Sequence, residues 1–191
     1  MTKSDVHQGR AAAAPAREPR PFLFLEPQRV TSQSAAFAPP DVAYLDAAAT
    51  DSVPALVRAI VGFTIALQNR RALEHGDVHP IQLSVLNRRR RAARAWLVAI
   101  LAGRTDASTQ HAVATQWLPT LCGTGPDVAA CSAPASRLVE FVRGAVTACL
   151  FDAPSDNLLP HAKALFVLEQ TLAIHLGAVR NAARRGEPVR A

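Results

Sequence analysis

The chain lacks several sequence features that particular protein classes require, and each absence argues against one of those classes. Its three cysteines lie at wide, unequal spacing and contain no CxxC pair, which argues against a zinc site and a framework of disulfides. No apolar run approaches the roughly 20 residues that cross a bilayer, and the N-terminus carries no apolar signal core. These shortages predict a cytoplasmic protein with reduced thiols, no metal and no membrane span.

Motifs for catalysis are also missing. No Ser-His-Asp order and no paired catalytic carboxylates stand out in the sequence. The run Gly123-Thr124-Gly125-Pro126 is rich in glycine but lacks the Lys-Ser/Thr end and the preceding strand of a phosphate-binding loop. Cys122 has no histidine nearby in the sequence to activate it, so we expect a buried, apolar thiol. The sequence therefore predicts a protein that is not an enzyme.

Acidic residues are outnumbered by basic ones, and the imbalance is local. The formal net charge is +6, and residues 1–50 hold five basic and five acidic residues, so the whole excess belongs to the later part. Such an excess favours acidic partners, among them nucleic acid and acidic lipids. It is modest, however, and an arginine-rich composition is also typical of GC-rich genomes.

The first 50 residues read as an N-terminal arm, either disordered or loosely docked. Their segment AAAAPAREPRP is low in complexity, and its prolines break any helix quickly. The apolar run Phe22–Leu25 follows, in which Phe22 and Phe24 either pack on the domain or dock on a partner. We expect a folded domain over residues 51–186 and a flexible tail over residues 187–191.

Apolar periodicity predicts helices almost throughout the folded domain, and no alternating strand pattern appears. The expected helices cover residues 54–73, 80–101, 107–115, 135–151 and 158–184, with a loop from Gly123 through Pro134. Asp51 or Ser52 is expected to cap the first helix and Asp156 the last. The fold class is therefore all-α, in a single domain of three or four long helices and some short ones.

The densest charge in the chain is an arginine cluster within the second expected helix. Its members are Arg88, Arg89, Arg90, Arg91 and Arg94. Four consecutive residues fan over roughly 300° of a helix, so at least one guanidinium group must approach the apolar side. Arg90 and Arg94 are one turn apart and could grip a phosphate or a carboxylate pair. The alternative is internal salt bridging, to Glu74, Asp77 or Glu169. Nucleic-acid readout has no supporting motif.

The histidines offer few ligand sets. His75 and His79 are four positions apart, but Gly76-Asp77 and Pro80 break the helix between them. His161 and His175 share one face of the last helix, where we expect His175 to be buried and hydrogen-bonded. His111 is expected to be a neutral imidazole on a helix face, with haem ligation as the alternative.

Three stretches resemble the sensor-globin group, which includes protoglobins, globin-coupled sensors and haem-free stressosome sensors. The first is Leu56–Phe63. The second is Arg94-Ala95-Trp96-Leu97 followed by Leu101-Ala102-Gly103-Arg104-Thr105-Asp106, similar to the family's Arg-x-Trp-Leu…Leu-x-x-Gly-Arg-Tyr-Asp run. The third, Ala164–Leu172, resembles the last globin helix. The resemblance implies a globin-like fold over roughly residues 55–184.

The chain departs from that family at the haem ligand. In haem-binding members a proximal histidine precedes a glycine and a proline at fixed short steps. If Gly123 and Pro126 occupy those positions, counting back places Leu118 or Pro119 where the histidine belongs, and neither side chain ligates iron. His111 lies about two helical turns too early. The resemblance therefore implies a protein without haem or another cofactor.

The resemblance also implies a function. Such modules are non-enzymatic sensory or regulatory domains, and they usually dimerise through their last two helices, here residues 135–151 and 158–184. Because the chain carries no output domain, we expect output through a protein partner, reached by Phe22–Leu25 or by the arginine cluster. Two alternatives stay open: a haem-binding gas sensor with His111 as an atypical ligand, and a basic helical adaptor for nucleic acid or an acidic protein.

Overall fold

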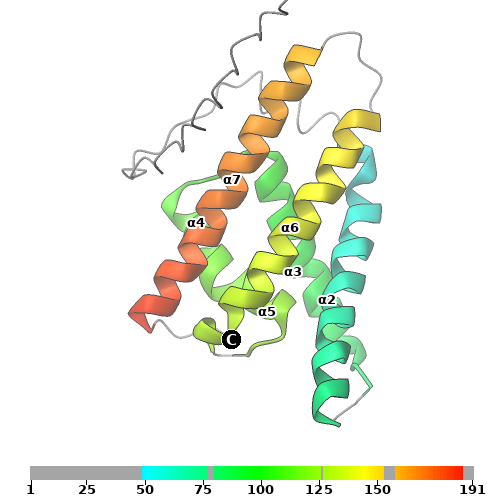
Figure 1. Ribbon diagram of the computed structural model, residues 1–191, viewed down its shortest axis with the longest axis vertical. Helices are drawn as coiled ribbons and strands as arrows, with labels where there is room; N and C mark the ends of the chain where they lie inside the picture. Colours follow the sequence, from blue (N-terminus) through cyan, green and yellow to red (C-terminus); the bar gives the residue numbers. More distant parts are fainter. Residues whose placement is uncertain (1–48, 77–79, 126, 153–157, 187–191) are drawn as a thin grey trace, which may run out of the picture. The chain divides into compact units, whose positions relative to one another are not determined.

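The computed structural model describes residues 49–76, 80–125, 127–152 and 158–186 (Figure 1). Contacts divide the chain into two units, Met1–Gln33 and Ser34–Ala191, and every described residue lies in the second. The described helices are η1 (Thr50–Ser52), α2 (Val53–His75), α3 (Leu83–Leu101), α4 (Ala107–Ala112), the π-helix η2 (Val113–Trp117), α5 (Leu118–Cys122), α6 (Val128–Asp152) and α7 (Leu158–Arg185). These residues contain no strand, which confirms the all-α class. The proposed arm, with Phe22 and Phe24, lies outside them, as does the tail.

Helix α2 has the predicted glycine at its C-terminal end but not the predicted side-chain cap at Ser52. Gly76 ends it in the left-handed conformation with φ of 75°, and its N–H donates to the carbonyl groups of the last turn. At the other end Ser52 makes no side-chain cap hydrogen bond. The predicted cap is wrong at Ser52 because η1 leads directly into α2 and gives this residue helical dihedral angles.

Helix α3 begins three residues later than Pro80. Gln82 is extended, with ψ of 144°, so the first turn starts at Leu83. Leu83, although apolar, is 68% exposed at this end of the helix. Gly103 follows the end of this helix and takes the left-handed conformation, with φ of 57°. The N–H of Arg104 donates a hydrogen bond to the carbonyl oxygen of Ala99 at 2.9 Å.

The chain from α4 to α5 turns continuously, so the predicted end at Thr115 is wrong. Pro119 does not interrupt it, because it lies in the first turn of α5. Asp106 caps α4 by accepting hydrogen bonds from the N–H of Thr109 at 2.9 Å and from its hydroxyl at 2.6 Å. Gly123 ends the segment with φ of 64°.

Helix α6 begins seven residues before its predicted start. Pro134 lies inside it and is buried. The expected loop through Pro134 is wrong because the early turns contribute buried contacts of their own, from Val128, Cys131 and Ala135. Asp127 also anchors this end, since its carboxylate accepts a hydrogen bond from the N–H of Ala130 at 2.9 Å.

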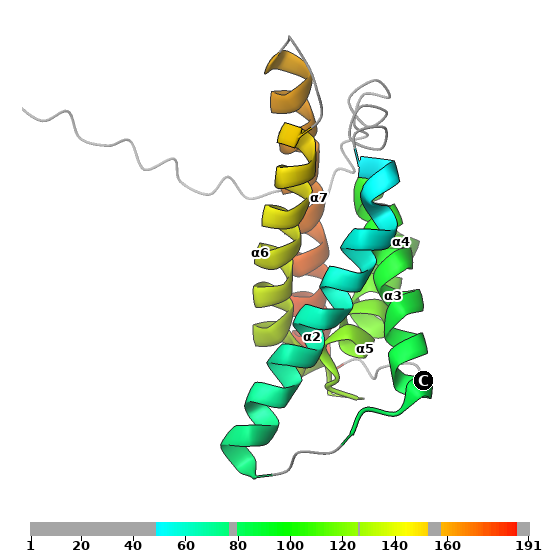
Figure 2. The same ribbon diagram turned by 90° about the vertical axis from the view of Figure 1, so that its right-hand side faces the viewer.

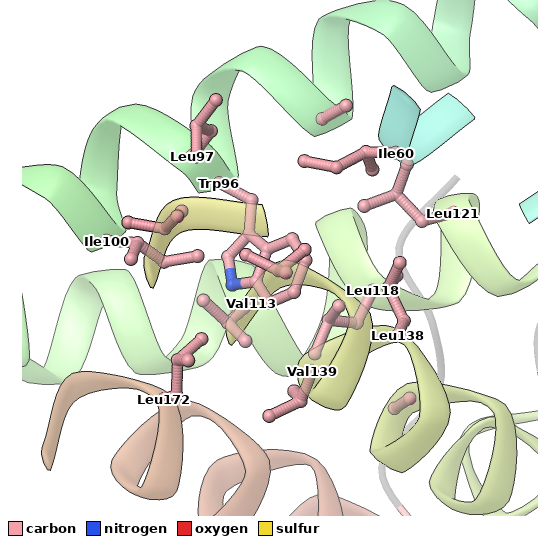
Figure 3. Close-up of a cluster of buried hydrophobic side chains, with 14 of the residues drawn as sticks. Ile60, Trp96, Leu97, Ile100, Val113, Leu118, Leu121, Leu138, Val139 and Leu172 are labelled. Carbon is pink, nitrogen blue, oxygen red and sulfur yellow. The ribbon is translucent and has the colours of Figure 1, made fainter. Parts of the chain in front are cut away.

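The long helices pack in two pairs. Helices α6 and α7 run antiparallel and side by side, and α2 packs on α3 (Figures 1 and 2). The α4–α5 segment contacts α3, α6 and α7 and closes the core from one side. Trp96 is fully buried at the centre of this core (Figure 3). The side chains drawn around it include Ile60, Leu97, Ile100, Val113, Leu118, Leu121, Leu138, Val139 and Leu172.

Two helices, Thr50–Glu74 and Leu159–Arg185, are long and apolar enough to cross a membrane by length and composition. This corrects the expectation that no segment approaches such a length. Both also supply the core, with Ile60 from the first and Leu168, Leu172 and His175 from the second. A buried core helix passes the same test, so the finding decides nothing about location.

Candidate functional site

Helix α3 divides the arginine cluster between two environments. Arg88, Arg90, Arg91 and Arg94 are exposed, whereas Arg89 is only 2% exposed. This confirms the prediction that at least one guanidinium group approaches the apolar side. The cluster therefore forms two distinct features, an exposed face and a buried cation.

The exposed face borders a groove of about 700 Å³ between α3 and the start of α2, which we call the arginine groove. Its lining residues are Thr50, Val53, Pro54, Val57, Arg90, Arg91, Arg94, Val98 and Leu101. The lining is mainly apolar, and the arginines come from α3. A second depression, of about 560 Å³, lies further along the same helix and is lined by Ser84, Asn87, Arg88, Arg90 and Arg91.

The expected internal salt bridges of the cluster do not form. Glu74 pairs instead with Arg70 at 3.4 Å, and Glu169 pairs with Arg143 at 2.9 Å, because these partners are nearest on α2 and across α6 and α7. Asp77 lies outside the described residues. Within the described part of the chain, no acidic side chain forms an ion pair with the cluster. The exposed guanidinium groups are therefore available to a partner.

Arg89 lies against α2 and the end of α5. Its Nη2 donates a hydrogen bond to Oε1 of Gln68, while Nε and Nη1 have no hydrogen-bond partner. A Cβ placed on Gly123 would lie 2.6 Å from Nη2, so the glycine leaves space for the guanidinium group. Burial lowers the pKa of Arg89, and negative charge on Cys122 opposes this shift.

A small cavity of about 80 Å³ adjoins this contact. Its lining residues are Thr64, Leu67, Gln68, Cys122, Gly123, Pro134 and Leu138. Cys122 is half-buried, so the predicted fully buried thiol is wrong. The difference arises because Cys122 ends α5 at the edge of the core, beside this cavity.

His175 joins α3 to α7 within the core. Nε1 of Trp96 lies 3.2 Å from its Nδ1, and its Nε2 lies 2.8 Å from the backbone oxygen of Arg104. The indole N–H can only donate, so Nδ1 accepts and Nε2 carries the proton that bonds the carbonyl. Burial lowers the pKa of His175. This confirms the prediction of a buried, hydrogen-bonded histidine.

The remaining histidines do not assemble a site among the described residues. His161 is buried and stacks on Phe151 with ring centroids 5.7 Å apart. His79 and the side chain of His75 lie outside the description. In the ranges described, no three His, Cys, Asp or Glu side chains gather as metal ligands.

No protein-family model matches this chain. No curated protein and no solved structure matches it either. The resemblance to sensor globins therefore stays a prediction from three stretches of sequence, and function is inferred from geometry.

The candidate haem ligand His111 borders neither of the two large described pockets. His111 is exposed on α4, while Leu118 and Pro119 are buried. Pockets that enclose a ligand of drug size measure about 300–1,000 Å³. The two described pockets of that size lie on the surface along α3, and His111 lines neither. Figure 3 shows packed side chains around Trp96. A described cavity of about 80 Å³ lies beside Gln68 and Cys122.

The sequence did not indicate which residues of α2 complete the arginine groove and the contact with Arg89. Val53 and Val57 of the arginine groove, and Gln68 beside Arg89, belong to α2. Gln68 is polar, and no pattern in the sequence indicated which part of α3 these residues of α2 meet. Val98 is 44% exposed in the groove, which only the structure shows.

Proposed function

We propose that this domain is a non-enzymatic regulatory module, of the globin-like sensor kind and without haem, that acts through protein contacts. We further propose that the arginine groove binds an acidic, amphipathic segment of a partner protein. One observation carries this proposal: Arg90, Arg91 and Arg94 border an apolar groove and have no described carboxylate partner. The sequence resemblance to sensor globins supports the regulatory role.

The groove has the chemistry of a helix-binding site. An amphipathic helix lays apolar side chains into a hydrophobic groove of this kind. Val53, Val57 and Val98 offer such a floor. Guanidinium groups bind carboxylates through paired hydrogen bonds, and Arg90 and Arg94 stand one turn apart, so they match acidic residues spaced by one turn on a partner.

Nucleic acid is the second candidate for the same arginines. A phosphate backbone would use the guanidinium groups but gain nothing from the apolar floor. The described groove has no aromatic residue on which bases could stack. The two candidates therefore differ in whether binding depends on Val98.

The binding test uses a labelled amphipathic Leu/Glu peptide of about 18 residues, or about five helical turns. Fluorescence anisotropy compares it with an all-polar Glu peptide and with labelled duplex DNA. The double variant Arg90→Ala/Arg94→Ala and the variant Val98→Gln should each weaken binding of the Leu/Glu peptide about tenfold, equivalent to about 1.4 kcal/mol.

The matched control is Arg180→Ala/Arg184→Ala, which removes two exposed arginines one turn apart on α7. This variant should bind like wild type. Binding of DNA that depends on the α3 arginines but not on Val98, and that falls steeply with salt, would support the adaptor alternative instead. Absence of peptide binding to wild type would remove the groove proposal.

A homodimer through α6 and α7 belongs to the same proposal. Three large apolar side chains on these helices are exposed by about 60% each: Phe151, Leu159 and Phe166. Burying them between two copies would be favourable. Light scattering during size-exclusion chromatography should give a dimer for wild type and a monomer for Phe166→Glu. A monomeric wild type would contradict this part.

A further inference from the structure

Arg89 poses an energetic problem that its hydrogen bonds do not solve. A buried guanidinium group needs a counter-charge or donors that are all paired, since its charge cannot be removed by deprotonation at neutral pH. Only Nη2 has a hydrogen-bond partner, and no described carboxylate pairs with the group. A negative charge close to Arg89 would therefore be strongly favoured.

Cys122 is the ionisable side chain placed to supply that charge. Its neighbour Gly123 lies directly against Nη2 of Arg89, and Gln68 contacts both the guanidinium group and the small cavity. Negative charge on Cys122 would raise the pKa of Arg89 against the effect of burial, in keeping with this placement. The C-terminal end of α5 disfavours a thiolate, and the guanidinium group of Arg89 beside Gly123 offers the opposing charge.

We propose that Cys122 is a reactive thiol, held as a thiolate by Arg89 and reached by small oxidants through the adjoining cavity. Reactive cysteines are partly exposed and lie in electropositive surroundings. The cavity of about 80 Å³ has room for about two waters at about 30 Å³ each, and so for one hydrogen peroxide molecule. This proposal is independent of the partner-binding function.

The oxidant class is a hydroperoxide. The thiolate sulfur of Cys122 attacks one peroxide oxygen, the S–O bond forms, and the O–O bond breaks. Sulfur gives up two electrons and becomes a sulfenic acid. The peroxide is reduced, and its second oxygen leaves as hydroxide, which takes a proton from solvent to become water.

The test compares two thiols in one folded protein. Cys149 on α6 is also half-buried, and Cys131 is buried. The reduced full chain is treated with limiting iodoacetamide, or with hydrogen peroxide and a sulfenic-acid trap, and each site is quantified by mass spectrometry. A free thiol is only about 3% ionised at pH 7. If Arg89 holds Cys122 largely as a thiolate, Cys122 should react about tenfold faster than Cys149 at pH 7.

Two variants at one position assign the effect. Arg89→Met should bring the rate of Cys122 down to that of Cys149, while Cys149 keeps its rate. Arg89→Lys retains the charge and should keep part of the advantage. The proposal fails if wild-type Cys122 reacts no faster than Cys149 between pH 6 and 9, whatever the variants do. It also fails if Cys122 is fast and stays fast in Arg89→Met.

Discussion

Replacing Arg89 by methionine should leave the fold intact and raise its stability. The change keeps an unbranched apolar stem in the core but removes a buried charge. Nε and Nη1 lack partners, and each buried, unpaired donor costs about 1–3 kcal/mol. Against this gain stands the lost bond to Gln68, about 1.5–3 kcal/mol for a charged donor. Gln68 is exposed and can bond water instead. We expect the free energy of unfolding to rise by about 1–2 kcal/mol.

Urea unfolding followed by circular dichroism measures this change, with Arg91→Met as the control. Arg91 is exposed on the same helix, so its replacement should shift the free energy by less than about 0.5 kcal/mol. Breaking a strong buried ion pair costs about 3–5 kcal/mol. A loss of that size in Arg89→Met would refute the reasoning, because Arg89 would then be fully compensated in the folded protein. If Cys122 pairs with Arg89 as proposed, its thiolate compensates part of the buried charge, so the gain should be smaller at neutral pH than at acidic pH.

Three further predictions concern the core and the Arg89 contact. Trp96→Phe leaves Nδ1 of His175 without its donor, so urea titration should show a loss of about 2–4 kcal/mol, and a change below about 0.5 kcal/mol would contradict the hydrogen bond. Burial lowers the pKa of His175, so on acidification the unfolded chain takes up a proton at higher pH than the folded protein does. The free energy of unfolding should therefore be constant above about pH 6.5 and fall as pH decreases below it. In His175→Gln this fall with decreasing pH should be smaller. Gly123→Ala should destabilise more than Gly125→Ala in thermal melts: both have positive φ, worth about 1–2 kcal/mol, but only Gly123 meets Arg89, and equal losses would argue against that contact.

The sequence predicted helix ends well where glycine sets them. Gly76 and Gly103 each take the left-handed conformation just after a predicted helix end. These ends are local, because a glycine stops a helix whatever packs beside it. Prediction failed at Pro119 and Pro134, which lie within helical segments. Whether a proline ends a helix depends on the burial gained by the residues around it, and that gain comes from other helices.

The candidate site shows the same division. Helical geometry alone required one arginine of the cluster to approach the core. That the core contact would be Gln68, and that Gly123 would leave space for the guanidinium group, depends on how α2 and α5 pack on α3. The groove likewise combines Val57 of α2 with Val98 of α3. Apolar periodicity describes one helix at a time, so it does not predict contacts between segments that are far apart in the sequence.

The identity of the buried arginine could have been deduced from the tryptophan. The apolar stripe of Leu86, Ala93, Leu97 and Leu101 centres about 25° from Arg90 but about 75° from Arg89, so it would have selected Arg90 as the buried arginine. Trp96 is the largest fully buried side chain, and Arg89 precedes it by seven residues, which is two turns within about 20°. Burying Trp96 therefore carries Arg89 to the same side.

That coupling explains the position of Arg89 but not its chemistry. An apolar residue at this point would satisfy the packing without a buried charge, and a buried ion is weak evidence for stability. The two unpaired donors of Arg89 therefore destabilise the folded protein, and packing alone does not require them. A role for the charge beside Cys122 accounts for that cost, and comparing the stability and thiol reactivity of Arg89→Met tests both halves of the explanation in one variant.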